Sequence, residues 1–449
     1  MTFSELQLCP TLLSAVAKCG YESPTPIQQK AVPPVLAGSD VMGIAQTGTG
    51  KTAAFALPIL QRLMDGPRGR VRALVLAPTR ELAEQIHEAF GLFGKNMKLR
   101  SVAVYGGVSM NPQIHKLRGG AEIVVACPGR LLDHIQHRAV NLSNLEVLVI
   151  DEADRMFDMG FLPDVKRIIG HLPAKRQTLF FSATMPDDIR RLSNEILTDP
   201  VTVQVDLAAP ANTVSHALYP VQQHLKTPLL LELLSRTDKE SVLVFTRTKH
   251  RATRVAEHLE KAGYKATSLQ GNLSQNKRQA ALDGFRRGSI QVLVATDIAA
   301  RGIDVSSISH VINFDMPDTA DAYTHRIGRT GRAAKTGDAF TLVSPEDSGM
   351  VHTISRLLGS KPEMRTLEGF DYKAPAPART TTFDRPRGDF RRREQDSSRP
   401  DRSRRPSASY DSRPAQGPRK DAARPEQPRR AAVYSERRPT GSRPRTGGR

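Results

Sequence analysis

Short apolar runs alternate with longer amphipathic stretches through roughly the first 370 residues of the chain. The first runs are ALVLAP (73–78), EIVVA (122–126), EVLVID (146–151) and TLFFSAT (178–184). A second series follows a polar, proline-containing stretch and consists of SVLVFTRT (241–248), QVLVATD (291–297) and HVINFD (310–315). Runs this short and rich in β-branched residues predict buried strands. Their alternation with helical stretches predicts helices packed on mostly parallel sheets.

The two series resemble each other. One strand in each ends in Thr-Arg (Thr79-Arg80 and Thr246-Arg247), and a later strand in each ends in an acid (Asp151 and Asp297). We therefore predict two α/β domains of similar design in tandem, with the active groups at the carboxyl ends of the strands. The expected boundaries are 31–205 for the first domain, 206–215 for a linker and 216–372 for the second domain.

Composition narrows the class of protein. The chain is 39% hydrophobic and 25% charged, and no window of about 18 residues is continuously apolar, which argues against a membrane-spanning protein. Its start has no basic segment ahead of an apolar stretch, so it does not read as a secretion signal. Three cysteines are too few for a disulfide framework or a zinc site. We expect reduced thiols in the cytoplasm.

The net charge of +19 is concentrated at the end of the chain, where residues 375–449 hold 21 Lys and Arg against 9 Asp and Glu. The same residues contain 11 Pro, one Val and no Leu, Ile or Met, which predicts a disordered tail over 373–449. Such a tail is either a solubilising linker or a sequence-tolerant RNA-binding arm. The arginine clusters and interspersed aromatic residues favour the arm.

A glycine-rich loop, GIAQTGTGKT (43–52), lies between a predicted strand and a helix that begins at Lys51. Its backbone amides can cradle phosphates, while Lys51 reaches the β/γ oxygens and Thr52 offers a hydroxyl to Mg²⁺. The glycine spacing also fits a dinucleotide fingerprint, but that site requires an acid at the end of the second strand, and this chain has Pro78-Thr79-Arg80 there. The sequence therefore favours a phosphate loop for a nucleoside triphosphate.

The run VLVIDEAD (147–154) supplies the carboxylates that such a loop needs. Asp151 is placed to bind the metal, and Glu152 is the candidate base that orients or deprotonates the attacking water. A surface acidic cluster at a helix start is the plainer alternative. The apolar strand that leads directly into this cluster argues against it.

The segment HRIGRTGR (325–332) places Arg326, Arg329 and Arg332 within eight residues. Arginines at this density are usually structural or solvated. Together with a phosphate loop in another domain, however, they become candidate arginine fingers that act only when the two domains close.

At this point the sequence resembles the DEAD-box RNA helicases, and in its compactness and Arg-rich tail the bacterial members. The resemblance covers residues 1 to about 370 and implies two RecA-like domains, with DEAD itself at 151–154 and an adenine-recognition segment at 1–30. It implies that Gln28 hydrogen-bonds adenine and Phe3 stacks on it, with ATP and Mg²⁺ as cofactors. The implied nucleotide-binding residues are Phe3, Gln28, Ala45, Gln46, Thr47, Gly48, Thr49, Gly50, Lys51, Thr52 and Asp304, with Thr52 and Asp151 at the metal.

The same resemblance implies RNA-contacting and coupling residues. The RNA contacts would be Pro78, Thr79, Arg80, Gly106, Gly107, Pro128, Gly129 and Arg130 in the first domain, and Arg247, Gln270, Gly271, Asn272, Thr296, Asp297 and Gly302 in the second. Ser182, Thr184, Asp154 and His325 would couple hydrolysis to strand separation, and Arg329 and Arg332 match the arginine fingers. One departure is Cys127, which stands where threonine is usual and puts a hydroxyl–phosphate contact in doubt.

These observations favour an RNA-dependent ATPase that unwinds short RNA duplexes locally and non-processively or displaces bound protein. Backbone and 2′-OH contacts carry no base information, so we expect RNA to bind with little sequence preference. An RNA chaperone or clamp and a DNA translocase of related design stay open as alternatives. Ribosomal precursors and RNA-decay proteins are candidate partners, and the sequence does not choose between ribosome assembly, RNA decay and cold adaptation.

Overall fold

The structure of the protein is a computed structural model. It describes residues 1–376 except 47, 206–213, 238–240, 301–307, 331–336 and 360, and the side chain of residue 321 is also left out. Most of the expected linker and nearly all of the expected tail lie outside the described residues.

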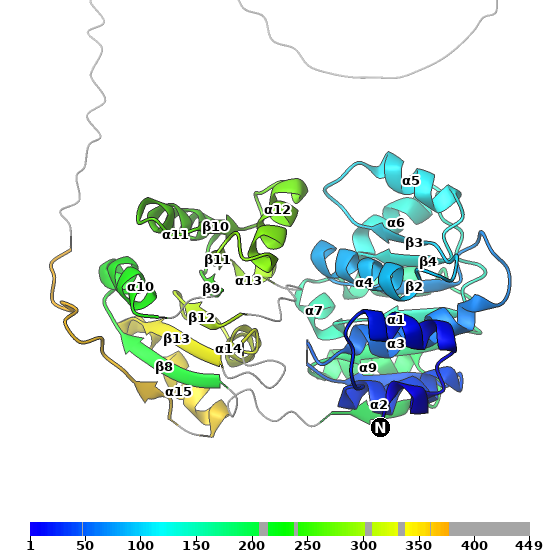
Figure 1. Cartoon of the computed structure of the whole chain (residues 1–449), viewed down its shortest axis with the longest axis horizontal. Coiled ribbons are helices and arrows are strands. Elements are labelled where there is room, and N and C mark those ends of the chain that lie inside the picture. The colour runs from blue at the N-terminus through cyan, green and yellow to red at the C-terminus, as the bar shows by residue number, and fades with distance from the viewer. Residues whose placement is uncertain are drawn as a thin grey trace, which may run out of the picture. The chain divides into compact units, whose positions relative to one another are not determined.

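The described strands form two seven-stranded sheets (Figure 1). The first has the order β3-β4-β2-β5-β6-β1-β7 and the second the order β10-β11-β9-β12-β13-β8-β14, and the paired strands are parallel. The first sheet consists of β1 (Val41–Ile44), β2 (Ala73–Leu76), β3 (Ser101–Val104), β4 (Ile123–Ala126), β5 (Val147–Ile150), β6 (Gln177–Ser182) and β7 (Val201–Gln204). The second consists of β8 (Val214–Pro220), β9 (Val242–Phe245), β10 (Ala266–Leu269), β11 (Val292–Ala295), β12 (His310–Asn313), β13 (Gly337–Val343) and β14 (Glu363–Met364). The predicted tandem of parallel α/β domains is confirmed.

Helices cover both faces of each sheet. Alternate side chains of the central strands therefore enter different cores. In β2, Ala73 and Val75 belong to one core and Leu74 and Leu76 to another. This is why these strands read as continuous apolar runs rather than as alternating ones. The helices of the first domain are α1 (Pro10–Lys18), α2 (Pro26–Leu36), α3 (Lys51–Met64), α4 (Arg80–Phe93), α5 (Met110–Arg118), α6 (Pro128–Gln136), α7 (Ala153–Asp158), α8 (Leu162–Ile169) and α9 (Asp187–Ile196). Those of the second are α10 (Lys226–Ser235), α11 (Lys249–Lys261), α12 (Gln275–Arg286), α13 (Asp297–Ala300), α14 (Ala320–Ile327) and α15 (Ser348–Leu358).

The two strand orders are the same when the sheets are matched strand by strand, so β2 corresponds to β9 and β5 to β12. Thr79-Arg80 and Thr246-Arg247 therefore follow corresponding strands. Asp151 and Asp297 do not follow corresponding strands, because Asp297 follows β11, the counterpart of β4. On β12, the counterpart of β5, the position of Asp151 is taken by Phe314, and Asp315 is the next residue. The backbone N–H groups of Phe314 and Asp315 both donate to the carbonyl of Phe245, as that of Asp151 donates to the carbonyl of Leu76.

No helix in the described part of the chain is long and apolar enough to cross a membrane.

Candidate nucleotide and RNA site

The glycine-rich loop connects β1 to α3, which begins at Lys51 as predicted. Gly50 has φ +94° and caps this helix, a left-handed conformation that favours glycine. Lys51 is buried, and its Nζ donates to the carbonyl of Ala45 across the loop at 2.7 Å. The loop thus holds a buried ammonium and the N-terminus of a 14-residue helix at the carboxyl edge of the sheet. This arrangement is suited to polyphosphate.

Gln28 on α2 connects the N-terminal segment to this loop. Its Oε1 accepts from the backbone N–H of Thr25 at 3.0 Å, and its Nε2 donates to the carbonyl of Gly50 at 3.1 Å. Gln28 is fully buried, whereas Phe3 lies against Tyr21 at the start of the chain. The structure therefore places the Gln28 amide against the phosphate loop, where one Nε2 hydrogen remains for a further acceptor.

Asp151 and Glu152 lie at the end of β5. Asp151 is fully enclosed, and burial raises its carboxyl pKa to about 6, although nearby Lys51 acts in the opposite direction. Glu152 has φ +51°, in the left-handed region, where the chain turns from strand to helix. Its carboxylate forms an ion pair with Arg155 at 3.4 Å. A non-glycine residue in this conformation is uncommon.

Asp154 binds the SAT segment (182–184) to α7. Its Oδ2 accepts from the backbone N–H groups of Ala183 (3.1 Å) and Thr184 (2.9 Å) and from the Thr184 hydroxyl (3.1 Å). In return, Ser182 Oγ accepts from the Asp154 N–H at 3.2 Å. Residues that the sequence separates by about thirty positions are therefore joined by four hydrogen bonds.

The predicted RNA-contacting residues of the first domain come together after β2, β3 and β4. Arg130 donates to the carbonyl of Val108 at 3.1 Å, which attaches α6 to the loop that carries Gly106 and Gly107. Gly107 has φ +77°, and a Cβ there would overlap the guanidinium of Arg80. Two arginine side chains thus lie beside a pair of glycines that add no side chains of their own.

The remaining residues of this set have local structural roles. Thr79 caps α4 by accepting from the N–H of Leu82 at 3.3 Å. Pro128 begins α6, with Gly129 next to it, and Pro78 precedes the α4 cap. Cys127 occupies the cap position of α6 without a side-chain cap bond, and burial raises the pKa of its thiol to about 12, so it stays protonated at neutral pH.

In the second domain, Arg247 follows β9 and is held by Asp315. The Arg247 N–H donates to Asp315 Oδ2 at 2.8 Å, and the guanidinium forms an ion pair with Asp318 at 3.4 Å. Arg251 takes the other oxygen of Asp315 at 2.5 Å. Asp315 therefore orients the loop that presents Arg247.

Arg326 is buried and makes a two-pronged pair with Asp297, both bonds measuring 2.6 Å. It also donates to Asn313 Oδ1 and to the Asp315 carbonyl, and its guanidinium lies 5.1 Å from the ring centroid of Phe245. Arg326 on α14 thus contacts four residues at or just after strand ends, which are Phe245, Asp297, Asn313 and Asp315. Of the three arginines predicted as fingers, Arg326 is placed as a structural support, and the carboxylate of Asp297 is occupied by it.

The loops after β9 and β10 are also joined. Lys249 Nζ donates to Asn272 Oδ1 at 3.0 Å, and the Asn272 N–H donates to Gln270 Oε1 at 2.6 Å. Gly271 lies between them with open space where a Cβ would be. Thr296 follows β11 and donates its N–H to Leu269 at 3.4 Å.

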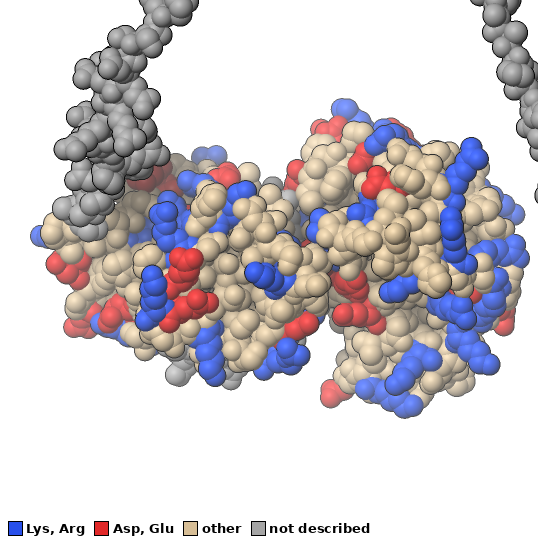
Figure 2. Space-filling model, turned by 90° about the horizontal axis from the view of Figure 1, so that it is seen from above, with Lys and Arg blue, Asp and Glu red and all other residues tan. Residues whose placement is uncertain are grey.

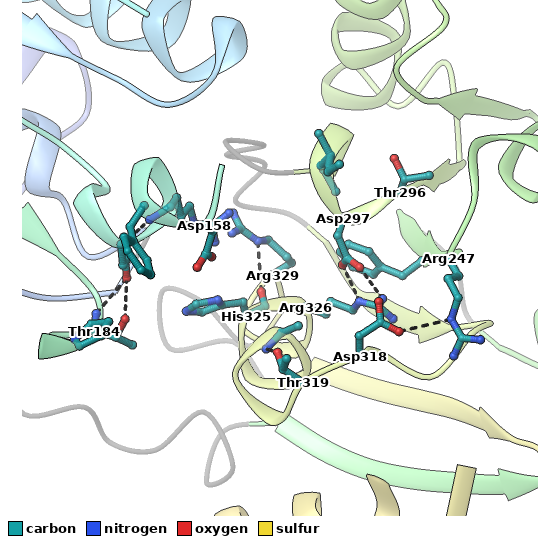
Figure 3. A pocket seen from close by; sticks show the side chains of 18 residues that line it. Asp158, Thr184, Arg247, Thr296, Asp297, Asp318, Thr319, His325, Arg326 and Arg329 are labelled. Atoms are coloured by element: carbon teal, nitrogen blue, oxygen red, sulfur yellow. Dashed lines mark hydrogen bonds and ion pairs between the residues drawn. The ribbon is translucent and has the colours of Figure 1, made fainter. Parts of the chain in front are cut away.

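A cavity of about 540 Å³ collects several of these groups (Figure 3). Its lining includes Asp154 and Thr184 from the first domain. From the second domain the predicted residues in the lining are Arg247, Thr296, Asp297, His325 and Arg329. Figure 3 shows Asp297 facing Arg326 and Arg247 facing Asp318. Arg329 is buried, with Nε donating to the His325 carbonyl at 3.3 Å.

Four predicted residues lie outside the described residues: Thr47, Gly302, Asp304 and Arg332. Gln46, Thr49 and Thr52 are described, and Thr49 donates its hydroxyl to the Gln46 carbonyl at 2.8 Å. The sequence analysis missed Asp315 and the supporting contacts of Arg326. The acid that ends the HVINFD run is visible in the sequence, but only the strand order shows that it follows the strand corresponding to β5.

A phosphate loop, strand-end carboxylates and a second domain of the same topology define a nucleoside-triphosphatase of tandem design. Comparison with protein families agrees: residues 25–192 match the DEAD/DEAH box helicase model, and residues 225–334 match the helicase conserved C-terminal domain.

The relatives narrow the class further. The chain is 45% identical over 358 residues to the DEAD-box ATP-dependent RNA helicase CshA of Bacillus cereus, which covers 79% of this chain and 68% of that protein. It is 44% identical over 365 residues to CshA of Geobacillus kaustophilus, covering 81% and 78%. Among solved structures, S. cerevisiae Dbp5 bound to RNA and ADP BeF3 superimposes with a TM-score of 0.73 at 31% identity, covering 82% of this chain and 95% of that one. The protein belongs to the DEAD-box ATP-dependent RNA helicases of bacterial type.

Proposed function

We propose that the protein uses ATP hydrolysis for local, non-processive separation of RNA duplexes or for remodelling of RNA–protein complexes. The observation that carries this proposal is the binding of the SAT segment to Asp154 beside a cavity that also contains Arg247 and Arg329. The lining of this cavity thus includes Asp154, two residues after the candidate base, together with a candidate RNA-contacting residue, Arg247, and a candidate arginine finger, Arg329. A change at the nucleotide can therefore reach the RNA through short, well-bonded segments.

ATP would lie on the phosphate loop, with Lys51 leaving the Ala45 carbonyl for the phosphate oxygens. Mg²⁺ fits the residues present, because it is usually held by one or two carboxylates together with phosphate oxygens and water. Thr52 and the enclosed Asp151 would hold it there, and the bound ion supplies charge stabilisation to the transferred phosphoryl group. Burial raises the pKa of the Asp151 carboxyl, and a bound cation would lower that pKa again by stabilising the charged carboxylate.

Glu152 would orient or deprotonate the attacking water, with Arg155 holding its carboxylate in place. Arg329 and Arg332 would stabilise the charge that develops on the phosphoryl group once the domains close. Arg326 would act as a positioning residue, since its pair with Asp297 fixes the start of the segment that carries both fingers.

RNA would cross the two strand-end surfaces through backbone contacts. On the first domain these come from Arg80, Arg130 and the glycine loop, and on the second from Arg247 and Asn272. Positive side chains around exposed backbone amides recognise phosphates without reading bases. Dbp5 was solved with RNA and a nucleotide bound, which supports the same pair of ligands for this chain.

The tail would tether RNA near this site, and ribosomal precursors or RNA-decay proteins would be the partners. The three cysteines are free in the structure, in keeping with the reducing cytoplasm where we expect the protein to work.

Glu152→Gln tests the proposal. This variant should bind ATP and RNA but lose about 10²-fold or more of RNA-stimulated turnover, since a positioned base typically contributes 10² to 10⁴. Duplex separation should be measured with ATP and with a non-hydrolysable analogue, on RNA and on DNA. Unchanged turnover would remove Glu152 from the mechanism. Equal separation without hydrolysis would favour an RNA clamp, and preference for DNA would favour a translocase.

Arg329→Ala is the companion variant in the second domain. It should lower the ATPase rate, by up to about 10³ to 10⁵ for a finger of this kind, and leave ATP affinity without RNA unchanged. Loss of ATP binding in the absence of RNA would instead make Arg329 a ligand of the open state or a structural residue.

A further inference from the structure

The first sheet has a second charged edge that the functions above do not use. The amino ends of β2, β3 and β4 are neighbours, since these strands lie side by side at one end of the sheet. Because the strands are parallel, these ends lie on the edge opposite to the phosphate loop. The surface that we call the amino-edge surface consists of Arg68, Arg70, Lys95, Lys98, Arg100 and Arg118, all exposed. Figure 2 shows blue side chains crowding the right-hand side of the lobe on the right, with few red ones among them.

One buried carboxylate holds the loops of this surface together. Glu122, only 2% exposed, accepts from the N–H of Gly69 at 2.8 Å through Oε1 and from the N–H of Arg100 at 2.9 Å through Oε2. A Cβ on Gly120 would lie 2.8 Å from the Cα of Gly69, so two backbones meet here without side chains between them. The loops before β2 and β3 are therefore pinned to the turn before β4.

The arginine side chains strengthen the same arrangement. Arg100 donates to the Gly119 carbonyl at 2.8 Å, Arg70 to Asn144 at 3.1 Å, and Arg68 to the carbonyl of Met64 at 2.8 Å. These partners are neutral, so the contacts position the cations without cancelling their charge. The surface is thus partly preorganised, which lowers the entropy that a ligand must overcome.

The charge of this surface is poorly compensated. Within segments 64–70, 94–100 and 118–122, six Lys and Arg face two acids, Asp65 and Glu122. Glu122 is buried against backbone amides, so Asp65 is the one exposed acid of these segments. Unpaired cations gathered at this density repel one another and attract a polyanion.

We infer that the amino-edge surface binds the phosphate backbone of structured RNA that lies beyond the segment held at the carboxyl edge. The surface is rich in cations. Beside it one large apolar side chain, that of Leu92 at the adjoining end of α4, is exposed. Protein and membrane interfaces use apolar or aromatic anchors, whereas phosphate binding needs mainly cations and polar groups. This inference rests on the proposed RNA binding and adds a second contact area on the same domain.

The test uses the full chain with Lys95→Gln, Lys98→Gln and Arg118→Gln combined. These three side chains are exposed and make no hydrogen bond or ion pair with other described residues. The matched control combines Lys18→Gln, Arg190→Gln and Arg191→Gln, which removes the same charge from α1 and α9 of the same domain. Affinity is measured across a salt series for a short single-stranded RNA and for the same RNA joined through an unpaired linker to a hairpin.

The amino-edge variant should lose affinity for the hairpin RNA only, with the log–log salt slope falling by about 0.9 for each duplex phosphate that the protein no longer neutralises. The control should match the unmodified protein, and ATPase on the short RNA should be unchanged in both. Hairpin binding and slope equal to those of the control would overturn the inference, as would an equal loss on both RNAs. Loss of binding to an acidic protein or to anionic vesicles, with hairpin binding intact, would assign the surface to another partner. If the unmodified protein bound neither RNA, the proposed function itself would fail.

Discussion

Asp154→Asn probes how the DEAD segment holds the SAT segment. The carboxylate has two oxygens that accept four hydrogen bonds, one from the N–H of Arg155 and three from Ala183 and Thr184. Asparagine keeps the shape but replaces one acceptor by an NH₂ group. In either orientation of the amide, that NH₂ group faces an N–H donor, and the negative charge that strengthened the other bonds is gone.

The cost can be worked out from these hydrogen bonds. At least one hydrogen bond to a charged group is removed, worth about 1.5 to 3 kcal/mol, and one buried donor is left unsatisfied at about 1 to 3 kcal/mol. The free energy of unfolding of the first domain should therefore fall by roughly 2.5 to 6 kcal/mol. For a domain of this size, each kcal/mol lowers the midpoint by about 2 to 4 °C, so a decrease of at least about 5 °C is expected.

Thermal and denaturant unfolding of the full chain measure this decrease, and the control is Asp199→Asn, the same change at an exposed carboxylate. That control should stay within about 0.5 kcal/mol of the unmodified protein. Duplex separation per ATP hydrolysed should also fall in Asp154→Asn, because the SAT segment is no longer fixed to α7. A change below about 1 kcal/mol would show that the carboxylate charge does not hold the two segments together.

Three further predictions address other parts of the molecule. Gly50→Ala should weaken ATP binding and lower stability more than Gly38→Ala, measured by nucleotide titration and unfolding; both have positive φ, but only a Cβ on Gly50 would meet the Gln28 amide, at 2.5 Å. Arg326→Lys keeps the charge but loses the two-pronged pair, so it should lower RNA-stimulated ATPase and cost about 1.5 to 3 kcal/mol of stability, and an unchanged rate would refute its positioning role. Deletion of residues 375–449 should raise the KM for RNA far more than it lowers kcat and reduce the salt slope, whereas abolished ATPase at saturating RNA would make the tail part of the catalytic unit.

Elements whose cause is local could be predicted from the order of the residues. Runs such as 73–78 and 146–151 are β-branched and too short for helices, so they predict buried strands at nearly the observed positions. The glycine-rich loop with its lysine predicts the start of α3, because helix N-termini and phosphate loops have short-range requirements. Strands with mixed polarity, such as β3 and β10, were missed. β3 lies at a sheet edge and alternates between buried and half-exposed residues, which gives a weaker pattern over four positions.

Which strand ends meet, in contrast, depends on the order of strands in the folded sheets. In the sequence both Asp151 and Asp297 follow an apolar run, but the strand order places Asp315, and not Asp297, after the strand that corresponds to β5, and Asp297 pairs with Arg326. Folding also brings Asp154 to the SAT segment and Glu122 to the loops of the amino-edge surface. These contacts join residues tens of positions apart. Their partners are set by the order in which strands pair, and strand pairing depends on packing across the whole sheet rather than on any local run of residues.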